Sequence, residues 1–404
     1  MIFNDSFFRE QLIALTRNPS LIEPRIWIAN ALASREDSRG VQLLKDLFER
    51  CLESGETLSA LWLTLLLKKH APLFSHQEYF QRIASAQSSE QSEAIPSLHQ
   101  PAASQEPEEV SELITSLEGE DLISQSIAVA QDWSLIETLT QHTKVIPLIS
   151  ALEEGKINLL LNTLQLRSFM PGEPLIEEGE EADGVYWICG GNVEVTRRNQ
   201  QAETIQLAVL SSGTLVGEMG LITRSPRVAT VSSLTLTQGI LLPLAAYPLL
   251  DDAQEQVNFA LSHLVGRRML ENLTKFSPVF KAIPPEAHPE LLSQFKAKVV
   301  PAGEVFLKQG QSGRGLYLIL DGLVQVDQLG SIDSKWLREG DIFGEISLVY
   351  DSPVSATCTT ARRSLLYTLK PDRFQSLVSR YPEIKHTLAE LSLFRNLDGL
   401  YTLT

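Results

Sequence analysis

Residues 170–195 read MPGEPLIEEGEEADGVYWICGGNVEV, and residues 300–326 repeat the same pattern as VPAGEVFLKQGQSGRGLYLILDGLVQV. Three turn glycines and a tyrosine recur 131 positions later, and a Gly-Glu pair followed by a proline recurs 127 positions later. A repeat of this length indicates one structural unit built twice. The matched residues are Gly172, Gly179, Tyr186, Gly191, Gly217, Glu218 and Pro226 in the first copy, and Gly303, Gly310, Tyr317, Gly322, Gly344, Glu345 and Pro353 in the second.

Both copies alternate apolar and polar residues over short segments, which predicts β-strands with one buried face. Val185, Trp187 and Cys189 form one such series in the first copy. Glycine at the turns permits the positive φ that tight hairpins require. We therefore expect an α+β protein with two tandem antiparallel β-barrel or jelly-roll domains of about eight strands each. An apolar helix is expected after each domain, over residues 249–276 and 373–394.

The part of the chain before the repeat is expected to be helical, because only four of the 23 glycines precede residue 166. Helical spacing of apolar residues predicts an all-α N-terminal module, which resembles a tetratricopeptide-type hairpin in Trp27, Ala29 and Ala33. Serine, glutamine, glutamate and proline then dominate, as in flexible linkers. The expected divisions are a helical module at residues 1–84, a flexible acidic linker at 85–109, connecting helices at 110–144, and the two repeat domains at 145–276 and 277–404.

Charge and composition restrict the class of protein. The chain has 404 residues and a net charge of −16, and eleven acidic residues lie between Arg82 and Lys144, where no lysine or arginine occurs. Overall acidity disfavours binding to DNA or to an anionic membrane. Cys51, Cys189 and Cys358 are too scattered for a disulfide framework or a cysteine metal site. No apolar run reaches the roughly 18–20 residues of a membrane span, so we expect a cytoplasmic protein.

The segment VGEMGLITRSPRVATV, residues 216–231, is the predicted binding site of the first copy. A short helical turn after Gly217 would direct free backbone N–H groups toward an anion. Arg227 would add a two-pronged guanidinium, which suits phosphate. Glu218 would repel a bare phosphate, but it can accept hydrogen bonds from a neighbouring ribose hydroxyl. Together these residues predict a site for a small phosphate ester of a sugar.

This segment resembles the phosphate-binding cassette of the cyclic nucleotide-binding domain family, the module of protein kinase A regulatory subunits and bacterial catabolite activator proteins. The resemblance implies that Glu218 accepts from the ribose 2′-hydroxyl and that Arg227 pairs with the cyclic phosphate. It also implies a purine lid from the helices after the domain. The implied ligand-binding residues are Gly217, Glu218, Gly220, Arg227, Val228 and Ala229, and the candidate lid residues are Tyr247, Phe259, Phe276 and Phe280.

The second cassette, residues 343–357, departs from the family pattern. Val354 stands where the family has its phosphate arginine, so a phosphate beside Glu345 would have no cation at that position. This copy is therefore expected to be structural, to be an interaction surface, to bind an uncharged nucleoside-like ligand, or to hold a cyclic nucleotide through another donor. Its candidate site residues are Gly344, Glu345, Ser347 and Ser355.

The resemblance implies a receptor without catalytic activity or cofactor, which binds cAMP or cGMP in the first domain and relays a conformational change to an unidentified protein effector. In the family, a hydroxyl residue after the arginine favours cGMP, and Val228 lacks a hydroxyl, which favours cAMP. The alternative is a scaffold protein whose domains bind another small ligand, such as a nucleoside, or none.

Three other functions conflict with the sequence. A transcription factor of the catabolite activator type needs a basic recognition helix, and only 32 residues follow Asp372. A basic pseudosubstrate for a kinase needs the lysines or arginines that residues 83–143 lack. A cupin enzyme needs clustered histidines, whereas residues 143–262 and 289–385 contain none.

Overall fold

The computed structural model describes residues 3–71, 75–88, 114–132, 149, 152–198, 203–223, 226–253, 294–329 and 334–397. The chain divides into two compact units, one of residues 1–217 with 228–254 and the other of residues 218–227 with 255–404. The helices are α1 (Asp5–Arg17), α2 (Glu23–Ser34), α3 (Ser38–Glu53), α4 (Thr57–His70), α5 (His76–Ser88), α7 (Gly119–Gln131), α9 (Glu154–Thr163), α10 (Glu218–Thr223), the 3₁₀ helix η1 (Leu244–Ala253), α14 (Glu345–Val349), α15 (Pro371–Arg380) and α16 (Pro382–Leu397).

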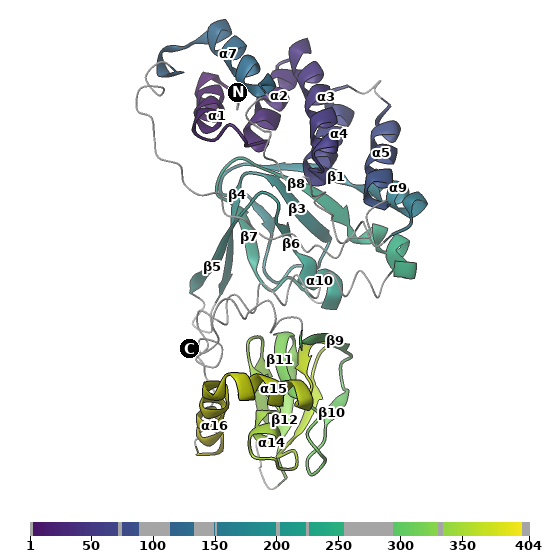
Figure 1. The fold of residues 1–404 in the computed structure, drawn as a ribbon, viewed down its shortest axis with the longest axis vertical. Helices are drawn as coiled ribbons and strands as arrows, with labels where there is room; N and C mark the ends of the chain where they lie inside the picture. Colours follow the sequence, from purple (N-terminus) through teal and green to yellow (C-terminus); the bar gives the residue numbers. More distant parts are fainter. Residues whose placement is uncertain are drawn as a thin grey trace. The chain divides into compact units, whose positions relative to one another are not determined.

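Each repeat copy forms a sandwich of two four-stranded antiparallel sheets (Figure 1). In the first domain the sheet orders are β1-β8-β3-β6 and β2-β7-β4-β5, and in the second they are β9-β16-β11-β14 and β10-β15-β12-β13. The strands are β1 (Gln165–Phe169), β2 (Pro174–Ile176), β3 (Gly184–Gly190), β4 (Asn192–Arg198), β5 (Thr204–Ser211), β6 (Leu215–Val216), β7 (Thr230–Ser233), β8 (Thr237–Pro243), β9 (Lys296–Val300), β10 (Val305–Leu307), β11 (Leu316–Asp321), β12 (Leu323–Asp327), β13 (Lys335–Arg338), β14 (Ile342–Phe343), β15 (Thr357–Thr360) and β16 (Ser364–Leu369).

The two domains therefore share one strand order, which confirms the predicted α+β fold with two tandem copies. Among the described residues, each strand is hydrogen-bonded only to strands of its own sheet, and no strand joins the two sheets of a domain. The observed form is therefore the jelly-roll sandwich and not a closed barrel. Alternating residues of both sheets fill each core. Ile188 and Val193 are fully buried in the first core, and Ile319 and Val324 are fully buried in the second.

The N-terminal helices form because capping side chains and close helix packing agree with the apolar pattern. Asn4 accepts a hydrogen bond from the Phe7 N–H at the start of α1, and Asp37 accepts one from the Arg39 N–H at the start of α3. A Cβ at Gly40 would overlap with the backbone of Ala33, so glycine is required where α3 crosses α2.

Helix α7 packs against α1 and α2 of the N-terminal module. The sequence predicts only connecting helices at residues 110–144 and gives no sign of this packing. The guanidinium of Arg25, buried in α2, donates to the Val129 and Ala130 carbonyls at the end of α7, at 2.8 and 2.6 Å. A cation at a helix C-terminus satisfies carbonyls that lack helical partners. Burial lowers the pKa of Arg25, and nearby Asp132 opposes that shift.

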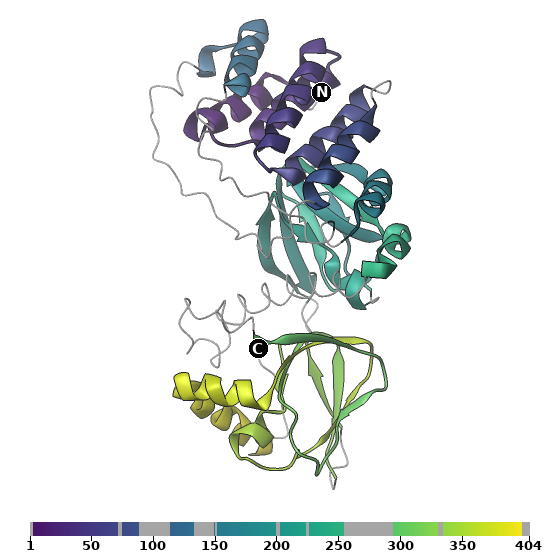
Figure 2. The same ribbon diagram turned by 45° about the vertical axis from the view of Figure 1, so that its right-hand side comes forward.

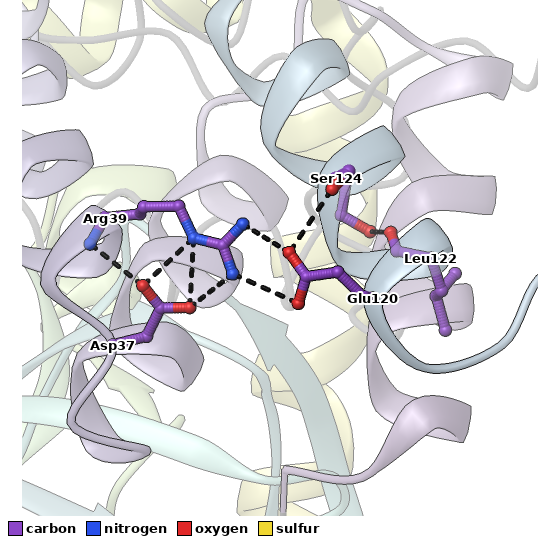
Figure 3. A network of polar contacts seen from close by, with 6 residues as sticks. Asp37, Arg39, Glu120, Leu122 and Ser124 are labelled. Atoms are coloured by element: carbon purple, nitrogen blue, oxygen red, sulfur yellow. Dashed lines mark hydrogen bonds and ion pairs between the residues drawn. The ribbon is translucent and has the colours of Figure 1, made fainter.

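A surface ion-pair network also joins α7 to the module (Figure 3). Arg39 donates to Asp37 at 2.6 Å and to Glu120 at 2.6 Å, and these hydrogen bonds lower the pKa of both carboxyl groups. Two acidic residues of the segment at 110–144 are thus paired with arginines of the module: Glu118 with Arg9 of α1, and Glu120 with Arg39 of α3.

The helical module packs on the first sandwich within one compact unit (Figure 2). Glu23 of α2 accepts hydrogen bonds from the Gly191 N–H at 2.7 Å and the Ser212 hydroxyl at 2.6 Å. Trp62 of α4 donates to the Gln238 side chain in β8 at 2.6 Å. These polar contacts help to fix where the helices lie on the sheet, above all the buried one from Trp62, because a shift of α4 would leave its indole N–H without a partner.

Three predicted boundaries differ from the structure or lie outside it. Helix α5 continues to Ser88, past the expected start of the linker at residue 85, and residues 89–113 lie outside the described residues. The 3₁₀ helix η1 ends at Ala253, and the rest of the helix predicted at 249–276 also lies outside them. The single helix predicted at 373–394 is two helices, which are separated at Tyr381 before Pro382.

Candidate functional site

The first cassette begins where β6 ends. Strand β6 pairs with β3 through Tyr186 and Val216, and the chain then turns at Gly217, which has a φ of 83°. That left-handed conformation favours glycine. Helix α10 follows directly, and β7 begins at Thr230. The predicted sequence of strand, turn, short helix and strand is therefore observed.

The two charged residues of this cassette are buried. Glu218 is 7% exposed and Arg227 is 5% exposed. Gly220 is buried as well, and Val228 and Ala229 are half-buried. Buried charges in proteins are usually held by partners of opposite charge or by hydrogen bonds. A carboxylate and a guanidinium so placed give the cassette both an acceptor for hydroxyl groups and a donor for an anion.

The second cassette repeats this backbone with different chemistry. Gly344 has a φ of 81° and precedes α14, and Glu345 is 2% exposed. The Ser347 hydroxyl donates to the Gly344 carbonyl at 3.0 Å, and a Cβ at Gly313 would overlap with the Ser347 side chain. Ser355 is half-buried. Ser347 is thus engaged within the cassette and packed against the loop that precedes β11.

Val354 belongs to the core of the second domain. It is 7% exposed and lies in the same apolar cluster as Phe306 and Ile319. Its N–H donates to the Gln311 carbonyl at 2.8 Å, and its carbonyl accepts from the Gly310 N–H at 2.9 Å. The residue that replaces arginine therefore fills space in the sandwich interior.

Burial raises the pKa of two groups in the strands next to this cassette. Burial raises the pKa of the Cys358 thiol in β15 to about 12, with a further contribution from Glu345. Burial also raises the pKa of Tyr317 in β11, and Arg314 opposes that shift.

Sequence reasoning missed a pocket on the second domain. Its volume is about 410 Å³, and two of its lining residues, Lys308 and Arg314, are cationic. The alignment of the two copies contains a sign of it, because Lys308 and Arg314 of the second copy stand where the first copy has the acidic residues Glu177 and Asp183.

Only one of the four candidate lid residues lies within the described part of the chain. Tyr247 is buried in η1, whereas Phe259, Phe276 and Phe280 lie outside the described residues.

Within the part of the chain that the structure describes, no group of three or more His, Cys, Asp or Glu residues could hold a metal ion. No described helix is both long enough and apolar enough to cross a bilayer.

Curated proteins similar to this chain include kinase regulatory subunits. The cAMP-dependent protein kinase regulatory subunit of Candida albicans is 28% identical over 254 residues, which are 61% of this chain and 51% of that protein. The type II regulatory subunit of Drosophila melanogaster is 30% identical over 223 residues, which are 54% of this chain and 55% of that protein. The chain spans about half the length of these two relatives.

Solved structures of regulatory subunits are also similar. The regulatory domain of Toxoplasma gondii PKA with cAMP is 19% identical with a TM-score of 0.28, over 61% of this chain and 91% of that one. The regulatory subunit of a cAMP-independent protein kinase A from Trypanosoma brucei is 19% identical with a TM-score of 0.27, over 62% of this chain and 86% of that one.

The family model for the cyclic nucleotide-binding domain matches this chain twice, and each match lies within one of the two sandwiches and the elements next to it. The matched ranges fall inside the predicted domains at 145–276 and 277–404. The chain therefore contains two domains of the cyclic nucleotide-binding domain family, one at residues 166–247 and one at residues 297–381.

Proposed function

We propose that this chain is a cyclic nucleotide receptor without catalytic activity, which binds cAMP or cGMP in its first domain. The observation that carries the proposal is the first cassette itself, in which Gly217 with its positive φ is followed by Glu218 and then by Arg227, inside a range that matches the cyclic nucleotide-binding family model. The second cassette keeps the glutamate as Glu345 but has Val354 in its core instead of a cation.

The two buried residues have complementary roles in this proposal. Arg227 pairs with the cyclic phosphate, and charge-assisted hydrogen bonds of this kind contribute about 1.5–3 kcal/mol each. Glu218 accepts from the ribose 2′-hydroxyl, so its charge is used for hydrogen bonding at a distance from the phosphate. Gly217, Gly220, Val228 and Ala229 supply backbone close to the ligand. Val228 has no hydroxyl to offer a guanine amino group, so we propose cAMP as the preferred ligand.

The relay to an effector is proposed to pass through the helical module. Glu23 and Trp62 tie helices α2 and α4 to the first sandwich, so a change in that sandwich alters the support of the helices. A ligand can shift such an equilibrium only by its difference in affinity for the two states. The effector is proposed to be a protein kinase catalytic subunit, as the names of the relatives suggest, reached by surfaces other than a basic segment within residues 83–143.

We also propose that the protein acts in the cytoplasm. Cys51, Cys189 and Cys358 are free and buried, which suits a reducing compartment. Burial raises the pKa of all three thiols, so they stay protonated and unreactive near neutral pH.

Calorimetric titration of the full chain with cAMP and cGMP tests the ligand assignment. Saturable binding is expected, and Arg227→Ala should weaken it about 100-fold, because roughly 3 kcal/mol of phosphate contact is lost. Arg167→Ala is the matched control, since Arg167 is exposed in β1 and donates only to nearby Gln165. Absence of binding at about 50 µM nucleotide, or unchanged binding in Arg227→Ala, would contradict the proposal.

A further inference from the structure

The pocket on the second domain has the size and the chemistry of a small-molecule site. Its volume of about 410 Å³ lies within the range of about 300–1,000 Å³ that is typical for such sites. None of the described residues that line it is acidic. The lining residues are Val305, Phe306, Lys308, Gln311, Arg314 and Thr357.

The loop between β10 and β11, which lines the pocket, has the opposite charge from the corresponding loop of the first domain. Lys308, Gln311 and Arg314 stand at the positions that are occupied 131 residues earlier by Glu177, Glu180 and Asp183. At the cassette the opposite change occurs, because the first domain has Arg227 where the second has Val354. The second domain thus lacks a cation in its cassette and carries two cations on the facing loop between β10 and β11.

Hydrogen bonds hold this loop against the cassette of the same domain. The Gly310 N–H donates to the Val354 carbonyl at 2.9 Å, and the Gln311 carbonyl accepts from the Val354 N–H at 2.8 Å. The Gln309 N–H donates to the Thr357 hydroxyl at 3.2 Å. That hydroxyl oxygen accepts from the backbone, so its own proton is available to a ligand. The cations are therefore presented by a fixed loop beside the second cassette.

Neither Lys308 nor Arg314 forms an ion pair with a carboxylate among the described residues. Other cations of this domain do so: Lys298 pairs with Glu304 at 3.4 Å, and Arg362 pairs with Asp321 at 2.6 Å. Both pocket cations are exposed. Two adjacent cations without an internal counter-charge produce a positive potential that attracts an anion.

We propose that this pocket binds the phosphate monoester group of a small organic molecule. Lys308 and Arg314 neutralise the phosphate, and Gln311 and Thr357 donate hydrogen bonds to it. A phosphate monoester carries a charge of about −1.5 to −2 at neutral pH, which matches two cations. A cyclic phosphate diester carries a single negative charge and matches them less well. Phe306 and Val305 provide apolar contact for the rest of the molecule.

The test uses the full chain with Arg227→Ala, so that binding at the proposed cyclic nucleotide site is weakened about 100-fold. Inorganic phosphate and 5′-AMP are titrated calorimetrically, and the comparison ligands are adenosine, which lacks the phosphate, and cAMP, whose phosphate is esterified to both the 3′- and the 5′-oxygen. At least one of the two phosphate probes should bind with a Kd below about 1 mM, 5′-AMP should bind at least tenfold more tightly than adenosine, and cAMP should bind more weakly than 5′-AMP. Arg314→Gln and Lys308→Gln should each reduce the affinity about tenfold or more.

Lys298→Gln is the matched control, because Lys298 is an exposed lysine of the same domain that is already paired with Glu304. It should leave the affinity unchanged. The proposal is overturned if neither phosphate probe binds, if Arg314→Gln binds as tightly as its parent, or if adenosine binds as tightly as 5′-AMP. Cyclic nucleotide binding by the unmodified chain is measured separately, so either site can fail without the other.

Discussion

The two sandwich domains share one strand order but place their charged residues differently. In both, a tyrosine of the central strand pairs with the strand before the cassette: Tyr186 with Val216, and Tyr317 with Phe343. In both, the cassette begins at a glycine with positive φ and continues with a buried glutamate. The first cassette then has Arg227, whereas the second has Val354, which is buried in the apolar cluster of its own domain.

Under the proposed function, this difference means that the fold and the ligand are specified by separate residues. The glycines and apolar positions that build the sandwich are retained in both copies, so both copies fold in the same way. The ligand chemistry depends on a few side chains that the core does not need. Under the proposed function, the exchange of the cassette arginine for valine removes the phosphate contact and places an apolar side chain in the core.

The largest contrast is expected at the paired cassette glutamates. Glu218→Ala should weaken cAMP binding by about 10- to 100-fold, because it removes a charged acceptor that contributes about 1.5–3 kcal/mol. Glu345→Ala is the matched variant of the second domain and should leave the cAMP affinity within about twofold. Calorimetry measures both. Equal losses in the two variants would show that both cassettes bind the nucleotide.

A second contrast concerns the sheet that receives the helices. A Cβ at Gly190 would lie 2.7 Å from Trp62 and 2.8 Å from Trp27, whereas the equivalent position 131 residues later is Asp321, which pairs with Arg362. Gly190→Ala should lower the free energy of unfolding by about 1–3 kcal/mol through overpacking. Chemical denaturation of the full chain measures this change.

Gly155→Ala is the control for that variant, since a Cβ at Gly155 in α9 meets no atom within 4 Å. It should be neutral or stabilise the protein by up to about 1 kcal/mol. A Gly190→Ala variant as stable as the parent protein would show that the helices do not press on the sheet at this position.

The third contrast tests whether Val354 is a core residue. Val354→Thr should lower the stability of the second domain by about 1–2 kcal/mol, because it places a hydroxyl in the apolar cluster. Val305→Thr makes the same change at a valine that is 53% exposed, and it should shift stability by less than about 0.5 kcal/mol. Thermal unfolding measures both variants, and equal shifts would argue against a packing role for Val354.

The smallest contrast concerns the end of the cassette helix. Tyr350, at the end of α14, has its hydroxyl 3.0 Å from the Ser392 hydroxyl in α16. The equivalent residue 127 positions earlier is Thr223. Tyr350→Phe should cost about 0.5–1.5 kcal/mol and speed hydrogen exchange in α16. Unchanged exchange would show that this contact does not hold α16 in place.

The repeat predicted most of the fold because turn glycines and alternating strands are local signals. The displacement of 131 positions placed β3 and β11 in equivalent positions, and the Gly-Glu pair located both cassettes. Long-range polar contacts give no such signal. Arg25 donates to carbonyls more than 100 positions away, so its interaction with α7 could not be predicted from helical periodicity.

Two other features could have been predicted from local residues of the sequence: the break between α15 and α16, and the cations of the pocket. Pro382 cannot donate the hydrogen bond that a continuous helix needs, and it therefore separates α15 from α16. The exchange of Glu177 and Asp183 for Lys308 and Arg314 was visible in the repeat. Only the structure shows that these two cations line one pocket beside the second cassette.

The central claim is that the first cassette binds a cyclic nucleotide and the second does not. The number of cAMP molecules bound per chain, measured by calorimetry on the full chain at saturating cAMP, tests it most directly. The account predicts one molecule per chain, with an affinity that falls about 100-fold in Arg227→Ala and is unchanged in Val354→Thr. Two molecules per chain, or an affinity that is unchanged in Arg227→Ala, would contradict it.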